Sequence, residues 1–139
     1  MRAPEQFFDT NVLLYLLSGD NAKADRAEEV IGLGGHISVQ VLNEFASVAT
    51  RKLKMSHADV REIIAPIRAL CKVQPLTEAV HDLGLQIAER YQLSVDDSMI
   101  AAAALTTGCT TLLSEDMQDG LVIQESLHIQ NPFQRKSPT

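Results

Sequence analysis

Apolar residues recur along the chain in two kinds of segment, and the short runs typical of strands alternate with longer, helically spaced runs. Several of the longer runs begin directly after a Ser or Thr that can cap a first helical turn. The predicted helices are Asn11–Leu17, Ala22–Leu33, Val39–Leu53 after a Ser38 cap, a segment from the Ser56–Asp59 capping box to Leu70 that kinks at Pro66, a segment from the Thr77 cap to Tyr91, and Val95–Thr107 after a Ser94 cap.

Short apolar runs between these helices predict the strands. They are a strand ending at Phe7 and Phe8, His36–Ser38, Lys72–Leu76, Cys109–Leu113 and a last short one near Leu121. Strands that alternate with helices indicate an α/β fold, here one domain over residues 1–139 with a mainly parallel sheet of four or five strands and helices on both faces. The polar end of the chain, about residues 132–139, is expected to be a loose tail.

The net charge of −6 bears on function, because a protein that coats nucleic acid is usually basic. The charge argues against nonspecific wrapping of DNA, but an enzyme that grips a nucleic acid locally stays compatible with it. The densest basic cluster, Arg51–Lys54, is interpreted as a solvated helix end, where cations suit the helix dipole.

The chain carries no sign of a membrane or secretory segment. Its apolar runs are too short to span a bilayer, and its first residues lack the pattern of a signal peptide. Cys71 and Cys109 form no CxxC pair and are interpreted as buried thiols in a reducing compartment. We therefore expect a cytoplasmic protein with no membrane partner.

Acidic residues follow the strands of this predicted sheet. Asp9 comes directly after the first strand and Asp116 after the last clear one, so both lie at the carboxyl edge of the sheet, where ligands bind. Asp97 begins a helix that leads through a single glycine back into that last clear strand. The helix covers about 20 Å and the strand about 17 Å, so the start of the helix returns to the same edge. Glu44, in the second turn of the helix after the second strand, lies there too.

Four carboxylates at one edge repel each other, by roughly 3 kcal/mol for a pair about 5 Å apart. Either some of them are protonated or a cation lies among them. Ligands that are all hard oxygens favour Mg²⁺ or Mn²⁺. Each acid also has a plainer interpretation: Asp9 as a strand-end acid, Glu44 as a solvated side chain, Asp97 as part of a capping box with Ser94, and Asp116 and Asp119 as turn formers. Their meeting at one edge favours the metal site.

The segments that carry these acids are FFDTNVLLYLL, ISVQVLNEF, YQLSVDDSMIAAAAL and TLLSEDMQDG. In order and spacing they resemble the four motifs of the PIN-domain nucleases, in particular the VapC-type toxins of bacterial toxin–antitoxin pairs. The resemblance covers nearly the whole chain, and the ordered set is more specific than any single motif. It implies a three-layer α/β/α sandwich, a Mg²⁺ or Mn²⁺ cofactor, and endoribonuclease activity of the type II toxin kind on an RNA substrate.

Residue by residue, the resemblance assigns the catalytic and metal-binding roles to Asp9, Glu44, Asp97 and Asp116. One departure from the family pattern is Asp96, which stands where many members have an aromatic or apolar residue and which could share the role of Asp97. Ser98 likewise replaces a common alanine.

Further positions match polar residues that support the site in the family. These are Asn11 and Ser114, and Asp119 is expected to assist. The four histidines match no catalytic position and are interpreted as surface or core residues: His36, His57, His81 and His128.

The resemblance also implies two protein partners, a small antitoxin and a second copy of the chain in a homodimer. The early helices would form the dimer contact. Their apolar residues give modest support, since such residues more often belong to a core: Val12, Leu13, Tyr15 and Leu16.

Two other functions stay open from the sequence. A PIN domain with a decayed site would act only as a protein- or RNA-binding module, and the presence of all four acids argues against it. A phosphatase or receiver-type phosphoryl site would use the same sheet edge, but it requires a second acid beside Asp9 and a lysine after a late strand, and neither is present. Metal-dependent RNA cleavage separates the nuclease from the binding module, and turnover of a small phosphoester would favour the phosphoryl site.

Overall fold

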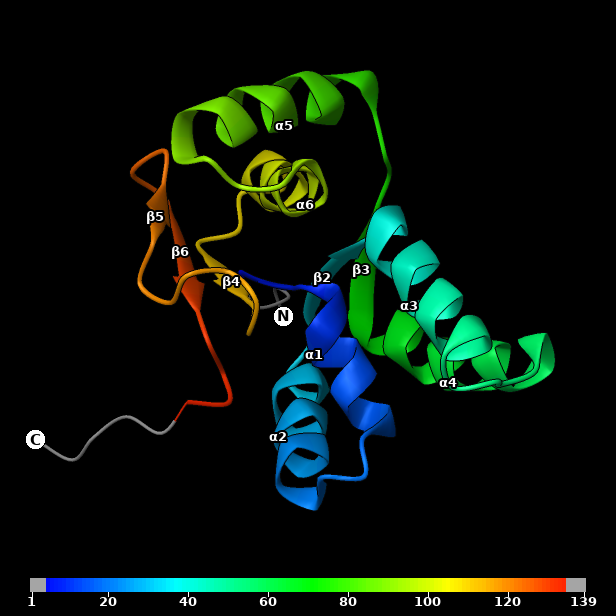
Figure 1. Ribbon diagram of the computed structural model, residues 1–139. Coiled ribbons are helices and arrows are strands. Elements are labelled where there is room, and N and C mark those ends of the chain that lie inside the picture. Colours follow the sequence, from blue (N-terminus) through cyan, green and yellow to red (C-terminus); the bar gives the residue numbers. More distant parts are fainter. Residues whose placement is uncertain (1–4, 135–139) are drawn as a thin grey trace, which may run out of the picture.

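Six short strands form one sheet in the computed structural model, which describes residues 5–134 (Figure 1). The strand order is β3-β2-β1-β4-β6-β5, and every neighbouring pair is parallel except β5 and β6. The strands are β1 Gln6–Phe8, β2 Gly35–Ser38, β3 Cys71–Gln74, β4 Thr111–Leu113, β5 Val122–Ile123 and β6 Leu127–Gln130. The α/β fold with a mainly parallel sheet is therefore confirmed.

The sheet has more strands than the four or five predicted, because β6 follows a two-residue β5 closely in sequence. In β6, Leu127 and Ile129 are buried and the residues between and after them are exposed. This alternation covers only four residues, and His128 separates the two buried ones. The segment therefore lacks the apolar run by which the other strands are predicted. Strand β6 extends the parallel sheet beside β4.

The helices lie close to their predicted positions. They are α1 Thr10–Leu14, α2 Asn21–Gly32, α3 Val39–Arg51, α4 His57–Leu70, α5 Glu78–Tyr91 and α6 Val95–Thr106, with a 3₁₀ turn, η1, at Tyr15–Leu17. The first predicted helix is thus divided between α1 and η1. Helix α4 continues through Pro66 without interruption.

The predicted N-caps explain why the helices start where they do. The hydroxyls of Ser38, Ser56, Thr77 and Ser94 each accept a hydrogen bond from the backbone N–H three residues later, at 3.1–3.3 Å. Since Ser38 ends β2, its cap makes α3 begin at the carboxyl end of that strand.

The helices form layers on the two sides of the sheet, as Figure 1 shows, with α5 and α6 on one side and α1 to α4 on the other. Helix α6 is buried nearly all round between the sheet and α5, and its Ala101–Ala104 run keeps it thin. Gly84 of α5 allows this close packing, because a Cβ there would collide with the Met99 side chain. Within the described residues, no helix is long and apolar enough to cross a membrane.

The end of the described chain is tied to the domain. Pro132 is buried and its carbonyl accepts a hydrogen bond from Arg26 Nε at 2.7 Å, while the Phe133 ring packs edge-on against Tyr15 at 4.6 Å. The prediction of a loose tail is therefore wrong for Pro132 and Phe133, whose contacts lie far back in the sequence. Residues 135–139, the rest of that predicted tail, lie outside the described residues.

Candidate metal centre

Asp9 occupies the junction between β1 and α1 and is almost fully buried, with 4% of its surface exposed. Its Oδ1 accepts a hydrogen bond from the Thr10 N–H at 2.7 Å, which makes Asp9 the N-cap of α1. Its Oδ2 accepts hydrogen bonds from Ser114 Oγ at 2.7 Å and Asn11 Nδ2 at 3.1 Å. Three donors therefore hold this carboxylate in one orientation.

The surroundings of Asp9 also change its acidity. The pKa of Asp9 is raised from 3.8 to about 6, mainly by burial; hydrogen bonds from Ser114 and Thr10 oppose the rise, and the negative charges of Asp97 and Asp116 contribute to it. A carboxylate that is buried, well supplied with donors and still difficult to ionise is suited to a positively charged partner.

Glu44 projects from the second turn of α3 toward the same place. Its Oε2 accepts a hydrogen bond from Thr10 Oγ1 at 3.1 Å, so the residue after Asp9 links the two acids. Burial raises the pKa of Glu44, the bond from Thr10 opposes the rise, and the charges of Asp96 and Asp97 increase it.

Asp97 takes part in the cap of α6 and also lines a cavity at the carboxyl edge of the sheet. Its backbone N–H donates to the Ser94 hydroxyl at 3.1 Å, and the residue lines this cavity together with Asp9. The pKa of Asp97 is raised by burial, lowered by a hydrogen bond with Ser94, and raised further by the charges of Asp116 and Asp96.

Asp96 differs from its neighbour in position. It is exposed and is absent from the lining of the cavity, and its carbonyl accepts a hydrogen bond from Gln40 Nε2 at 3.0 Å. Its negative charge still contributes to the raised pKa values of Glu44 and Asp97. The alternative in which Asp96 shares the place of Asp97 is therefore not supported by this geometry.

Asp116 lies in the loop after β4, and two supporting residues connect this loop to Asp9. Ser114 donates to Asp9 and accepts a hydrogen bond from the Met117 N–H at 3.2 Å. Asn11 donates to Asp9 and accepts a hydrogen bond from the Glu115 N–H at 3.2 Å. Each polar side chain thus ties the buried carboxylate to the loop that carries Asp116.

The four predicted acids line one cavity of about 280 Å³ at the carboxyl edge of the sheet. We call it the acid cavity. Its lining consists of Asp9, Thr10, Asn11, Leu14, Glu44, Ser47, Val48, Arg51, Asp97 and Asp116. The topological argument from the sequence brought the same four carboxylates together.

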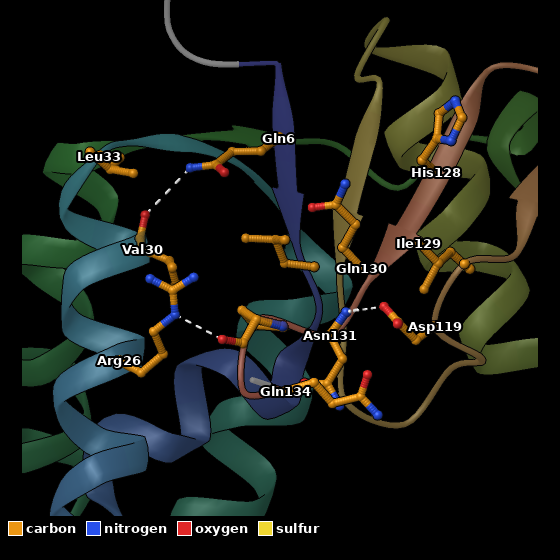
Figure 2. A pocket seen from close by; sticks show the side chains of 13 residues that line it. Gln6, Arg26, Val30, Leu33, Asp119, His128, Ile129, Gln130, Asn131 and Gln134 are labelled. Atoms are coloured by element: carbon orange, nitrogen blue, oxygen red, sulfur yellow. Dashed lines mark hydrogen bonds between the residues drawn. The ribbon is translucent and has the colours of Figure 1, made fainter. Parts of the chain in front are cut away.

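Asp119 does not belong to this group, and its predicted assistance is not supported. Its Oδ1 accepts a hydrogen bond from the Asn131 N–H at 2.8 Å, so the side chain fixes the turn before β5 to the residue after β6. Asp119 lines another, larger groove of about 890 Å³. Figure 2 shows this groove between α2 and the β4–β6 side of the sheet. That groove contains none of the four acids.

The larger groove contains polar groups that are already bonded within the protein. Gln6 Nε2 donates to the Gly34 carbonyl at 2.8 Å, and Arg26 Nε donates to the Pro132 carbonyl, a bond drawn in Figure 2. The four predicted acids line the smaller acid cavity and not this larger groove.

The four acids of the cavity would offer a metal ion only carboxylate oxygens, and such ligands fit a hard divalent cation. In residues 5–134, however, no three His, Cys, Asp or Glu side chains are close enough together to form a finished metal site. Mutual repulsion between Asp9, Asp97 and Asp116 opposes a closer approach. A cation among them would remove this repulsion and draw the carboxylates inward.

Sequence reasoning missed two groups of residues around the cavity. Glu115 accepts hydrogen bonds from the Tyr15 hydroxyl and from Lys23 Nζ, the latter at 2.9 Å, and so fixes the loop between Ser114 and Asp116. These partners lie about a hundred residues away in sequence, and no local pattern predicts the contact. Arg51, interpreted as a solvated helix end, lines the cavity itself.

Comparison with known families matches the PIN domain model to residues 7–118. That range contains all four acids of the cavity. Comparison with curated protein sequences finds no significant match.

Solved structures share the fold over most of their length. A toxin–antitoxin complex from Klebsiella pneumoniae contains a chain with 18% identity and a TM-score of 0.68, and the match covers 91% of this chain and 97% of that one. VapC20 from Mycobacterium tuberculosis, a sarcin-ricin loop cleaving toxin, has 19% identity, a TM-score of 0.64, and coverage of 80% and 91%. FitAcB from Neisseria gonorrhoeae has 18% identity, a TM-score of 0.64, and coverage of 92% and 98%. At these identities the likeness establishes the fold.

Proposed function

Because the chain belongs to the PIN domain family, we propose that it is a Mg²⁺- or Mn²⁺-dependent endoribonuclease and the toxin of a type II toxin–antitoxin pair. The observation that carries the proposal is the acid cavity, where carboxylates from four separate segments meet: Asp9, Glu44, Asp97 and Asp116. Burying a carboxylate costs free energy, and packing alone does not require one held by three hydrogen-bond donors.

The four acids would hold the cation, with Asp9 as the fixed ligand because its orientation is set by Ser114, Asn11 and the Thr10 N–H. A divalent cation in the cavity would supply electrostatic stabilisation to the charge that develops on the phosphodiester. Asn11 and Ser114 act as supporting residues, because they keep the loop that carries Asp116 beside Asp9.

Two of the acids are suited to proton transfer as well. In the metal-free protein, burial raises the pKa values of Glu44 and Asp97, so each carboxylate binds a proton more readily than an ordinary surface acid. Glu44 accepts a hydrogen bond from Thr10 and is partly exposed where it lines the cavity. Glu44 is therefore our choice for the group that orients and deprotonates the attacking water.

Purified protein is expected to cleave single-stranded RNA in Mg²⁺ or Mn²⁺, and excess chelator is expected to abolish cleavage. Asp9→Asn protein prepared by the same route controls for a contaminating nuclease. Cleavage that survives chelator, or that the variant retains in full, would overturn the metal mechanism. Absence of cleavage with either metal would favour the non-enzymatic binding module.

An antitoxin partner is proposed from the similar structures, two of which are complexes named as toxin–antitoxin or FitAB assemblies. We also propose that the protein forms a homodimer and acts in the cytoplasm. Val12 and Leu13 have no exposed surface, so they belong to the core and not to a dimer contact. Tyr15 and Leu16 are partly exposed and remain available to one. Sedimentation at micromolar concentration tests the dimer, which a monomer would exclude.

A further inference from the structure

One cation lines the acid cavity. Along α3, the residues Glu44, Ser47, Val48 and Arg51 follow each other at the spacing that places side chains on a single helix face, and all four line the cavity. Glu44 lies near the start of this face and Arg51 at its end, about 10 Å further along the helix axis. The cavity therefore has acids at its sheet edge and a guanidinium at its outer end.

Arg51 forms no ion pair with another residue in the described part of the protein. There, the ion pairs are Lys23 with Glu115 and Arg26 with Glu29, and neither involves Arg51. The guanidinium makes one long hydrogen bond, from Nε to the Ser47 carbonyl at 3.5 Å within its own helix. Arg51 is exposed, so its remaining donors face solvent at the mouth of the acid cavity.

Two further cations, Lys52 and Lys54, follow Arg51 within three residues. Lys52 is the C-cap of α3, and Lys54 has a φ of 58°, a left-handed conformation that turns the chain away from the helix axis. Both side chains are exposed. Interaction with the helix dipole accounts for cations at a helix end, but it does not account for a guanidinium that lines a cavity of carboxylates.

This protein repels a polyanionic substrate, because its net charge is −6 and acids line its cavity. Cations beside the cavity would lower this repulsion by contacting the phosphates that flank the one being cleaved. Arginine suits this task, since its planar guanidinium can donate two parallel hydrogen bonds to a phosphate.

We propose that Arg51, assisted by Lys52 and Lys54, is a binding site for a flanking phosphate of a single-stranded nucleic acid whose neighbouring phosphodiester enters the acid cavity. The proposal rests on the proposed nuclease function for the direction of the strand into the cavity. Arg51 binds substrate and takes no part in the chemical step, because about two helical turns separate it from Glu44. Its removal therefore weakens binding more than it slows turnover.

The experiment measures binding in chelator, where no cleavage is required. A fluorescein-labelled single-stranded RNA of mixed sequence and about 12 nucleotides is titrated with the protein, and anisotropy is followed over a series of salt concentrations. Wild type is compared with Arg51→Gln, with Arg51→Lys, and with Arg90→Gln. Arg90 lies on α5, on the other side of the sheet, is exposed, and its substitution removes the same charge.

Arg51→Gln is expected to weaken binding on the order of fivefold at about 0.1 M salt and to reduce the salt slope by about 0.7, the value for one lost contact to a single strand. Arg51→Lys should retain most of the affinity, and Arg90→Gln should resemble wild type. Unchanged binding in Arg51→Gln, or an equal loss in Arg90→Gln, would overturn the proposal. If the protein cleaves no RNA but Arg51→Gln still weakens binding selectively, the phosphate site stands and the nuclease function fails.

Discussion

Lys23 Nζ lies 2.9 Å from Glu115 Oε2, and this ion pair joins α2 to the loop after β4 across 92 positions of sequence. The Tyr15 hydroxyl contacts both partners, donating to Glu115 and accepting from Lys23. Burial alone would raise the pKa of Glu115, but hydrogen bonds from Tyr15 and Lys23 outweigh it and hold this pKa below its ordinary value. Glu115 is thereby kept ionised between the two site residues Ser114 and Asp116.

The first prediction follows from this contact. Glu115→Gln removes the ion pair and loosens the loop that carries Asp116, so RNA cleavage is expected to fall several-fold and the metal concentration for half-maximal activity to rise. Glu29→Gln, which breaks the Arg26–Glu29 pair on α2, is the matched control. Equal activity in wild type and Glu115→Gln at every metal concentration would show that the contact does not position the site.

Substitution of the proposed metal ligand gives the second prediction. Asp9→Asn preserves size but removes one negative charge, and cleavage should fall by orders of magnitude, since each 1.36 kcal/mol of lost stabilisation is about tenfold in rate. Asp96→Asn removes the same charge at an exposed position outside the cavity and should have a much smaller effect. Similar losses at Asp96 and Asp97 would contradict the assignment of Asp97.

Local contacts can be read from the sequence, and long-range contacts cannot. Ser38 and Ser94 are predictable as caps because capping needs only neighbouring residues, and these caps place the helices of Glu44 and Asp97 at the carboxyl edge. The four acids followed from topology in the same way. The contact of Lys23 with Glu115 could not be predicted, because it depends on how α2 packs beside a distant loop.

The directions of two side chains also lay beyond local reasoning. Asp119 shares a motif with Asp116 in sequence, but its side chain accepts a hydrogen bond from the Asn131 N–H and lies outside the acid cavity. Arg51 is exposed in the last turn of α3, as the sequence predicts, but it also lines the acid cavity. This second property depends on where α3 packs, which no local pattern gives.

The third prediction concerns the stability of the protein without metal. Asp97→Asn removes a charge that Asp9 and Glu44 experience as repulsion, and it leaves the backbone N–H that the Ser94 cap uses. Thermal melts in chelator are expected to show an unchanged or higher Tm. A large loss of stability would show instead that the Asp97 side chain acts mainly within the cap.

The fourth prediction concerns Ser98, which is fully buried in α6 and whose hydroxyl has no hydrogen-bond partner within the described residues. A buried unpaired hydroxyl costs about 1–3 kcal/mol, so Ser98→Ala should raise the free energy of unfolding by about 1 kcal/mol. Ser94→Ala on the same helix removes the cap and should lower it by about 1 kcal/mol. Denaturant melts of both variants test the pair, and a loss of stability in Ser98→Ala would contradict the prediction.

The last prediction is a pH dependence that Asp9 imposes on the metal-free protein. Its pKa is about 6 in the folded state against 3.8 ordinarily, so between these pH values the folded state binds more protons than the unfolded state. Stability from Asp9 is therefore present at low pH and is lost as the pH rises through about 6, by roughly 3 kcal/mol in total. In chelator, Asp9→Asn should gain stability relative to wild type as the pH rises from 4 to 7, and added Mg²⁺ should stabilise wild type most at the upper end, where Asp9 is ionised. Denaturant melts across this range measure both effects, and a difference between variant and wild type that stays constant with pH would contradict the raised pKa.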